Sequence, residues 1–204
     1  MIITHQKGRG KKIHLALDNE YQITTDIDFW AENFVKDGTD ITENEWQELV
    51  NKINFKKALN KCYDLLSRRD HSEKELKTKL LRTVDSENAD KAIERMKEYG
   101  YLDDEKYAKT LLKHLKDDKK MSESFIKQEM AKRGISRDIV VELLENEELD
   151  NVSAACDLIQ SKYRLKLQKE NGREKVFAAL IRKGFKYSDV KEAFNRIEND
   201  EYEY

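Results

Sequence analysis

The chain has 204 residues, of which 39% are charged and 38% are apolar, and its formal net charge at pH 7 is −2. The apolar share lies below the roughly 45–50% of ordinary globular chains, so one large globule around a single core is not expected. A net charge near zero neither requires nor excludes a polyanionic partner. Proline is absent and only seven glycines occur, which favours helix over most of the chain because proline interrupts helices.

The N-terminal residues carry a strand pattern. Residues 13–18 and 20–25 alternate apolar and polar side chains around an Asp18-Asn19 turn, which predicts a short β-hairpin. An isolated hairpin is only marginally stable, so we expect it to pack on the following helices or to pair with the strand-like residues 2–6.

Two helices are expected after this hairpin. The first covers about residues 27–36 and stops at Gly38, and the second opens with a capping box formed by Thr42 and Glu45. Together with the hairpin they predict a small α+β module over residues 1–54.

Beyond this module, apolar residues recur at an offset of 50 positions. Leu76 matches Ile126 and Val176, and the positions four residues later carry Leu80, Met130 and Leu180. A spacing of four places both positions on one buried helix face, so the pattern predicts tandem helical repeats. The expected N-caps of the second and third helices in these repeats are Ser72, Ser122, Asn171 or Gly172, Ser136 and Ser188.

The repeat pattern predicts a mainly α fold made of three-helix units. Stacked units of this size bury the faces that each unit alone would expose, which gives an elongated, curved array. The predicted segments are three-helix repeats at residues 55–102, 103–149 and 150–199, followed by an acidic tail at 200–204.

Positive charge is concentrated in the first two repeats. Residues 1–54 carry a net charge of −4, residues 55–134 carry +5 and residues 135–204 carry −3. A cation in the last turn of a helix can simply complement the helix dipole. A row of cations at one per repeat could instead meet phosphates or an acidic protein groove, and the two explanations are compatible. The candidate binding residues are Arg68, Arg69, Lys74, Lys77, Arg82, Lys132 and Arg133.

Six tyrosines in the repeats could stack on unpaired bases, but aromatic residues at helical spacing are more often core residues. We therefore expect them mainly in the core and assign none of them to base binding. They are Tyr63, Tyr99, Tyr101, Tyr107, Tyr163 and Tyr187.

The sequence predicts no catalytic residues, metal ligands or cofactor, and hence no enzyme. The four histidines are dispersed without the spacing of a zinc site, and no phosphate-binding glycine loop occurs. His71 and Ser72 are adjacent at a helix start, where neighbouring side chains point apart, and Ser72 is already explained as a cap. Asp103 and Asp104 are expected to cap the next helix.

Cysteine usage and hydropathy predict the compartment. Cys62 and Cys156 lack CxxC spacing, which favours buried free thiols in a reducing compartment. The longest apolar run, residues 176–181, is too short to span a membrane, and the polar N-terminus lacks the apolar segment of a signal peptide. We therefore expect a cytoplasmic protein without a membrane partner.

Three short segments resemble the signature segments of the RecX family. Residues 66–76 read LSRRDHSEKEL, residues 100–104 read GYLDD, and residues 132–135 read KRGI. They occur in the family's order within a triple-repeat region that covers about three quarters of the chain. The module at 1–54 is similar to the N-terminal extension of longer members from Gram-positive bacteria, although it has no sharp motif.

This resemblance implies a negative modulator of the RecA recombinase. Such a protein lodges in the groove of the RecA filament on single-stranded DNA and represses filament growth, ATP hydrolysis and strand exchange. The seven candidate cations are then the expected contacts to RecA or DNA. The third repeat departs from the family pattern. Its turn between the first and second helices, residues 169–172, lacks the paired arginines that the first repeat carries at Arg68 and Arg69.

Two other functions remain open at this point. The chain could bind DNA directly through a helix-turn-helix-like unit, although no helix face carries a convincing set of base-reading side chains. It could also be a helical-repeat scaffold that binds a peptide. We expect a monomer, and the sequence does not decide whether the main contact is to protein or to phosphate.

Overall fold

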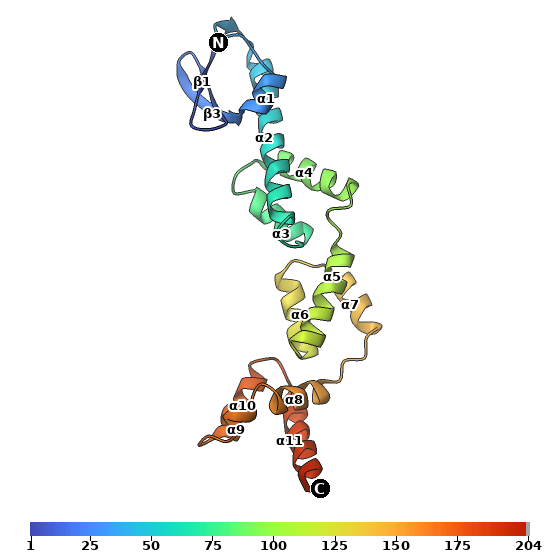
Figure 1. Cartoon of the computed structure of the whole chain (residues 1–204). Coiled ribbons are helices and arrows are strands. Elements are labelled where there is room, and N and C mark those ends of the chain that lie inside the picture. Colours follow the sequence, from blue (N-terminus) through green and yellow to red (C-terminus); the bar gives the residue numbers. More distant parts are fainter. Residues whose placement is uncertain (203–204) are drawn as a thin grey trace. The chain divides into compact units, whose positions relative to one another are not determined.

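The computed structural model describes residues 1–202, and the side chains of residues 1–199 (Figure 1). It is mainly helical with a four-stranded antiparallel sheet at the N-terminus, which confirms the predicted fold class. The chain divides into two compact units. The first unit comprises residues 1–70 and 76–102, and the second comprises residues 71–75 and the chain from Asp103 onward. The predicted acidic tail at 200–204 lies outside the residues whose side chains are described.

The first unit begins with the sheet, whose strand order is β3-β2-β1-β4. Asp18 and Asn19 both have positive φ angles, of 49° and 68°, as the tight turns of two-residue hairpins often require. The predicted hairpin is therefore confirmed, and so is its pairing with the first residues of the chain. The strands are β1 (Ile2–Lys7), β2 (Lys12–Leu17), β3 (Glu20–Asp26) and β4 (Thr39–Asp40).

Helix α1 (Ile27–Glu32) is shorter than the predicted 27–36. The sheet edge takes up the following residues, because Gly38 donates a backbone hydrogen bond to Ile3 and β4 pairs with β1. The helix therefore ends at its C-cap, Asn33, before the residues that pair with the sheet.

Helix α2 (Glu43–Leu66) starts at the predicted capping box, in which Thr42 and Glu45 satisfy each other's backbone N–H groups. The helix runs without interruption through the border predicted between residues 54 and 55. Its first half packs on the sheet, and its second half packs on α3 (Glu73–Leu80) and α4 (Ser86–Glu98). Helix α2 thus contributes buried residues to two hydrophobic clusters.

The second unit contains two further hydrophobic clusters. The first is formed by α5 (Asp104–Lys113), the π-helical turn η1 (His114–Asp118), α6 (Glu123–Lys132) and α7 (Arg137–Glu145). The second is formed by α8 (Asn151–Gln160), α9 (Arg164–Leu167), α10 (Gly172–Ile181) and α11 (Tyr187–Tyr202). The short helix α9 was not predicted.

The predicted N-caps are only partly correct. Ser122 and Ser136 cap α6 and α7 through hydrogen bonds from the third backbone N–H of each helix. Ser188 is not a cap, because α11 already begins at Tyr187 and the Ser188 hydroxyl donates to Asp189 instead. Asn171 occupies the N-cap of α10 with a left-handed backbone, and its side chain makes no capping hydrogen bond.

Cys62 is buried and Cys156 is half-buried, and neither forms a disulfide. Burial raises the pKa of the Cys62 thiol to about 11. Among the described residues, no helix is both long enough and apolar enough to cross a bilayer.

Candidate functional site

The start of α3, residues 71–75, belongs to the second unit and is fixed there by hydrogen bonds between side chains and backbone groups. The buried Ser72 hydroxyl accepts from the backbone N–H of Glu75 at 3.1 Å and donates to the backbone carbonyl of Arg133. The first N–H group of the helix, at Glu73, donates to the Asp104 carboxylate at 2.8 Å. These bonds satisfy donors that a helix start would otherwise leave unpaired.

The same arrangement occurs 50 residues later. The Ser122 hydroxyl accepts from the backbone N–H of Phe125 at 3.2 Å and donates to the backbone carbonyl of Lys183 at 2.9 Å. Ser72 and Ser122 are both buried. Each serine therefore caps its own helix and joins it to the end of the corresponding helix in the next segment.

Lys74 lies against the turn that ends α6. Gly134, in this turn, has a φ angle of +81°, and a Cβ atom added to it would come within 2.7 Å of the Lys74 Cβ. Only glycine permits both this backbone conformation and this close approach. The structure therefore brings Lys74 next to the 132–134 turn.

Arg133 is half-buried and already has partners within the protein. Its guanidinium donates to the Glu129 carboxylate and to the Tyr107 hydroxyl, both at 2.9 Å. Burial alone would lower the pKa of this guanidinium, but the two hydrogen bonds outweigh burial and raise it. Lys132, by contrast, is exposed and makes no side-chain hydrogen bond or ion pair within the described chain. Of these two neighbours, Lys132 is the better placed to bind a ligand.

The first unit holds the other four candidates. Arg68 is exposed and pairs with Asp64 at 2.7 Å, and Arg69 is exposed and donates to the Asp70 carbonyl at 2.8 Å. The ion pair of Arg68 lies at an exposed position, where such pairs contribute little to stability, so a ligand can replace it at low cost.

Of Lys77 and Arg82, only Lys77 has a carboxylate partner within the protein. The Lys77 ammonium contacts the Asp90 carboxylate at 2.5 Å, and its hydrogen bond holds the pKa of Asp90 below the ordinary value. Arg82 is exposed and has no hydrogen bond or ion pair among the described side chains. The seven cations thus belong to two units, and a single row that joins them stays a prediction.

The expectation that the tyrosines are core residues is wrong for four of the six. Tyr63, Tyr99, Tyr101 and Tyr187 are exposed, whereas Tyr107 is buried. Tyr99 and Tyr101 lie in the turn after α4, around Gly100 with its φ angle of +69°. For Tyr99 and Tyr101 the reason is that helical spacing does not determine the direction of side chains that lie outside the helix.

Three of these exposed rings form one cluster in the first unit. The Tyr101 ring contacts those of Tyr63 and Tyr99 edge-on, at centroid distances of 6.0 and 6.2 Å. The Arg95 guanidinium lies 5.7 Å from the centroid of the Tyr99 ring. Exposed aromatic rings beside a cation are suited to stacking on unpaired bases.

The groups considered for chemistry have structural roles. The Ser72 hydroxyl is engaged with two backbone groups, Asp103 caps α5, and Asp104 accepts from the backbone of Glu73. Within the described residues, no three His, Cys, Asp or Glu side chains gather as metal ligands would. A set of lysines around a cavity in the second unit was not singled out from the sequence.

Comparisons with known proteins all lead to one family. Residues 58–96 match the family model described as RecX, first three-helix domain. A regulatory protein RecX from Caldanaerobacter subterraneus subsp. tengcongensis is 29% identical over 198 residues, which cover 96% of this chain and 99% of that protein. A regulatory protein RecX from Clostridium perfringens strain SM101 is 27% identical over 203 residues, with 97% and 95% coverage.

Two crystal structures show the same fold. One, of a regulatory protein RecX, has a TM-score of 0.58 at 20% identity and covers 95% of this chain and 97% of its own. The other, of RecX from Lactobacillus salivarius, has a TM-score of 0.57 at 19% identity and covers 71% of this chain and 97% of its own.

Proposed function

Because the chain belongs to the RecX family, we propose that it is a negative modulator of the RecA recombinase. It binds as a monomer in the groove of the RecA filament on single-stranded DNA and represses filament growth, ATP hydrolysis and strand exchange. A RecA partner implies a cytoplasmic location.

The observation that carries this proposal is the state of the candidate cations. Arg82 and Lys132 are exposed without a partner among the described side chains, and Arg68 is exposed with an ion pair to Asp64, four residues before it. Such side chains keep their charge available to a polyanion or to an acidic protein surface. Arg133 and Lys77 are held by carboxylates, so they contribute less to binding.

A modulator of this kind acts by occupying a surface, and it needs no catalytic group. The hydroxyl and carboxylate groups at the start of α3 and α5 are used to hold helices together. This use of polar side chains fits a protein whose task is to present a fixed surface.

Direct binding to single-stranded DNA is the second candidate function. The exposed cluster of Tyr63, Tyr99 and Tyr101, with Arg95 beside it, favours this alternative because such rings can stack on bases without reading their sequence. The proposal predicts that binding to naked DNA is much weaker than binding to the filament, whereas the alternative predicts comparable binding to both.

ATP hydrolysis by RecA on single-stranded DNA tests the proposal. The assay compares the wild-type chain with a variant in which the exposed cations Arg68, Arg69, Arg82 and Lys132 are changed to Ala. A control variant carries Ala at four other exposed lysines, with three in the first unit and one in the second, namely Lys52, Lys56, Lys91 and Lys127.

We expect the wild type and the control to inhibit hydrolysis at substoichiometric concentration, and the first variant to lose inhibition while it remains folded. Equal inhibition by all three proteins would support the function but contradict the binding residues. No inhibition by the wild type would contradict the function.

A further inference from the structure

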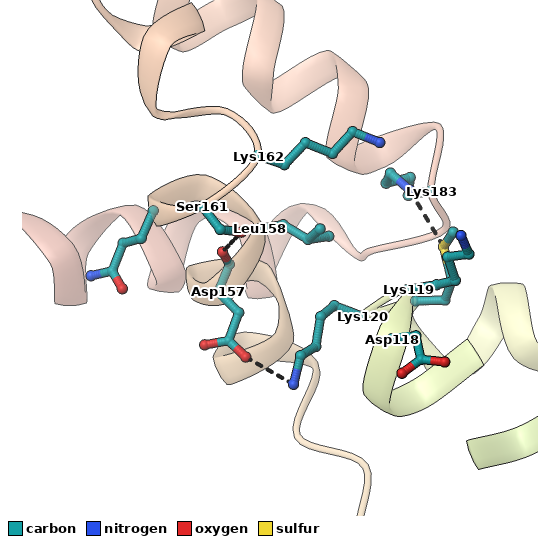
Figure 2. A pocket seen from close by; sticks show the side chains of 10 residues that line it. Asp118, Lys119, Lys120, Asp157, Leu158, Ser161, Lys162 and Lys183 are labelled. Atoms are coloured by element: carbon teal, nitrogen blue, oxygen red, sulfur yellow. Dashed lines mark hydrogen bonds and ion pairs between the residues drawn. The ribbon is translucent and has the colours of Figure 1, made fainter. Parts of the chain in front are cut away.

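The second unit contains a cavity of about 860 Å³ that is lined by four lysines. The lysines come from three separate places in the chain, namely the turn after η1, the turn after α8 and the turn after α10 (Figure 2). Met121 and Leu158 contribute apolar surface to the same cavity. The four lysines are Lys119, Lys120, Lys162 and Lys183.

The carboxylates in this cavity are already engaged. The Asp157 carboxylate pairs with Lys120 at 3.2 Å, and the Asp118 carboxylate lies 2.7 Å from the His114 Nδ1. The other three lysines have no carboxylate partner in the part of the chain that the structure describes. Four lysines and two aspartates therefore line one cavity, which leaves it a net charge of +2.

Lys183 is the most enclosed of the three. It is half-buried, and its ammonium makes only a weak contact with the Met121 sulfur, at 3.5 Å. Burial lowers the pKa of Lys183, and repulsion from Lys162 and Lys119 lowers it further. A cation in these surroundings is less stable than in water, and a bound anion would relieve both effects.

Comparison of the repeats shows that Lys183 lacks the carboxylate partner that the equivalent cation has in the preceding segment. Lys183 occupies the position 50 residues after Arg133. Arg133 pairs with Glu129 four residues before it, whereas the residue four before Lys183 is Ala179. The third segment thus keeps the cation and lacks the acidic side chain that neutralises it in the second.

We propose that this cavity binds phosphate groups through Lys119, Lys162 and Lys183. Lysine ammonium groups bind phosphate oxygens as compact point charges. The side chains that line the cavity include no aromatic ring on which a base could stack, so the site recognises charge and not base identity. The phosphate can belong to a free polyphosphate compound or to the backbone of a single-stranded nucleic acid.

This site goes beyond the seven cations of the proposed function, and binding to it requires no RecA. Tripolyphosphate is the probe for free phosphate, with binding measured by isothermal titration calorimetry. A fluorescein-labelled dT15 oligonucleotide is the probe for the strand, with binding measured by fluorescence anisotropy at several salt concentrations.

The test variant changes Lys119, Lys162 and Lys183 to Gln. A matched control changes Lys106, Lys109 and Lys113 to Gln, since these are three exposed lysines on α5, in the same unit, that make no ion pair there. A further variant changes only the exposed Lys119 and Lys162, in case Lys183→Gln prevents folding.

We expect the test variant to bind tripolyphosphate roughly tenfold or more weakly than the control does. If the strand is the ligand, the slope of log affinity against log salt also falls by about 2, because three phosphate contacts at about 0.7 each are lost. Loss for tripolyphosphate alone assigns the cavity to a free phosphate compound.

Three results would overturn the proposal. One is that the wild type binds neither probe, and another is that the test and control variants lose binding equally. The third, should Lys183→Gln not fold, is that the variant at Lys119 and Lys162 binds as the wild type does. Because no RecA is present, these results are distinct from a failure of the proposed function.

Discussion

Replacement of Ser122 by Ala isolates the hydrogen bond that joins two repeats. The Ser122 hydroxyl is buried, caps α6 through the Phe125 N–H at 3.2 Å and donates to the Lys183 carbonyl at 2.9 Å. Loss of an N-cap costs about 1 kcal/mol. Loss of the donor to the Lys183 carbonyl, in this part-buried hydrogen bond, costs about 1–3 kcal/mol more. We therefore expect Ser122→Ala to lower the free energy of unfolding by about 2–4 kcal/mol.

Ser136 provides the matched control. It is exposed and caps α7 with one long hydrogen bond, of 3.4 Å, to the Ile139 N–H. Its replacement by Ala removes a cap but no link between segments, so we expect a cost of about 0.5–1 kcal/mol. Urea unfolding of both variants, followed by circular dichroism, measures the difference. Equal losses of stability in the two variants would refute the idea that Ser122 joins the repeats.

Three further predictions concern single residues. Gly134→Ala should lose clearly more stability than Gly100→Ala in thermal unfolding, because both have positive φ but only Gly134 also has the Lys74 side chain in contact; equal losses contradict this packing. In the folded protein, an alkylating reagent should modify Cys156 well before Cys62, because burial raises the pKa of the Cys62 thiol to about 11. Mass spectrometry follows the two reactions, and a faster reaction of Cys62 would show that the hydrophobic cluster around it opens readily. Lys77→Met should raise the pKa of Asp90, since the Lys77 hydrogen bond is the largest cause of its lowering. In the wild-type chain the Lys77–Asp90 pair adds stability above the ordinary carboxylate pKa, and this stability is lost as pH falls through the lowered pKa. An Asp90 pKa that NMR titration finds unchanged in the variant excludes the pair.

Features that depend on local chemistry were predictable from the sequence. The Thr42–Glu45 capping box and the Asp18-Asn19 turn each use neighbouring residues whose side chains or backbone angles fix the local structure. The 50-residue period also located the buried faces of α3, α6 and α10, because only apolar residues fit there.

Features that depend on distant contacts were not predictable. Helix α1 ends early because a sheet edge takes the next residues, and α2 continues past residue 54 because two cores share it. The tyrosines around Gly100 point outward because they lie in a turn, where helical spacing does not apply.

The candidate site was likewise predictable only in part. The sequence located exposed cations such as Arg82 and Lys132, but it could not separate them from Arg133 and Lys77, which carboxylates hold in the folded chain. The lysine cavity was missed because its members are separated by up to 64 positions along the chain, from 119 to 183. The 50-residue relation of Lys183 to Arg133 was the one available signal.

Direct binding to the RecA filament is the measurement that tests the central claim most directly. Fluorescently labelled chain is titrated with RecA assembled on poly(dT) in the presence of a slowly hydrolysed ATP analogue, and with poly(dT) alone. We predict saturable binding to the filament that is much tighter than binding to the bare strand and that weakens when Arg68, Arg69, Arg82 and Lys132 are replaced by Ala. Binding to the bare strand as tight as binding to the filament, or no binding to the filament at all, would contradict the claim.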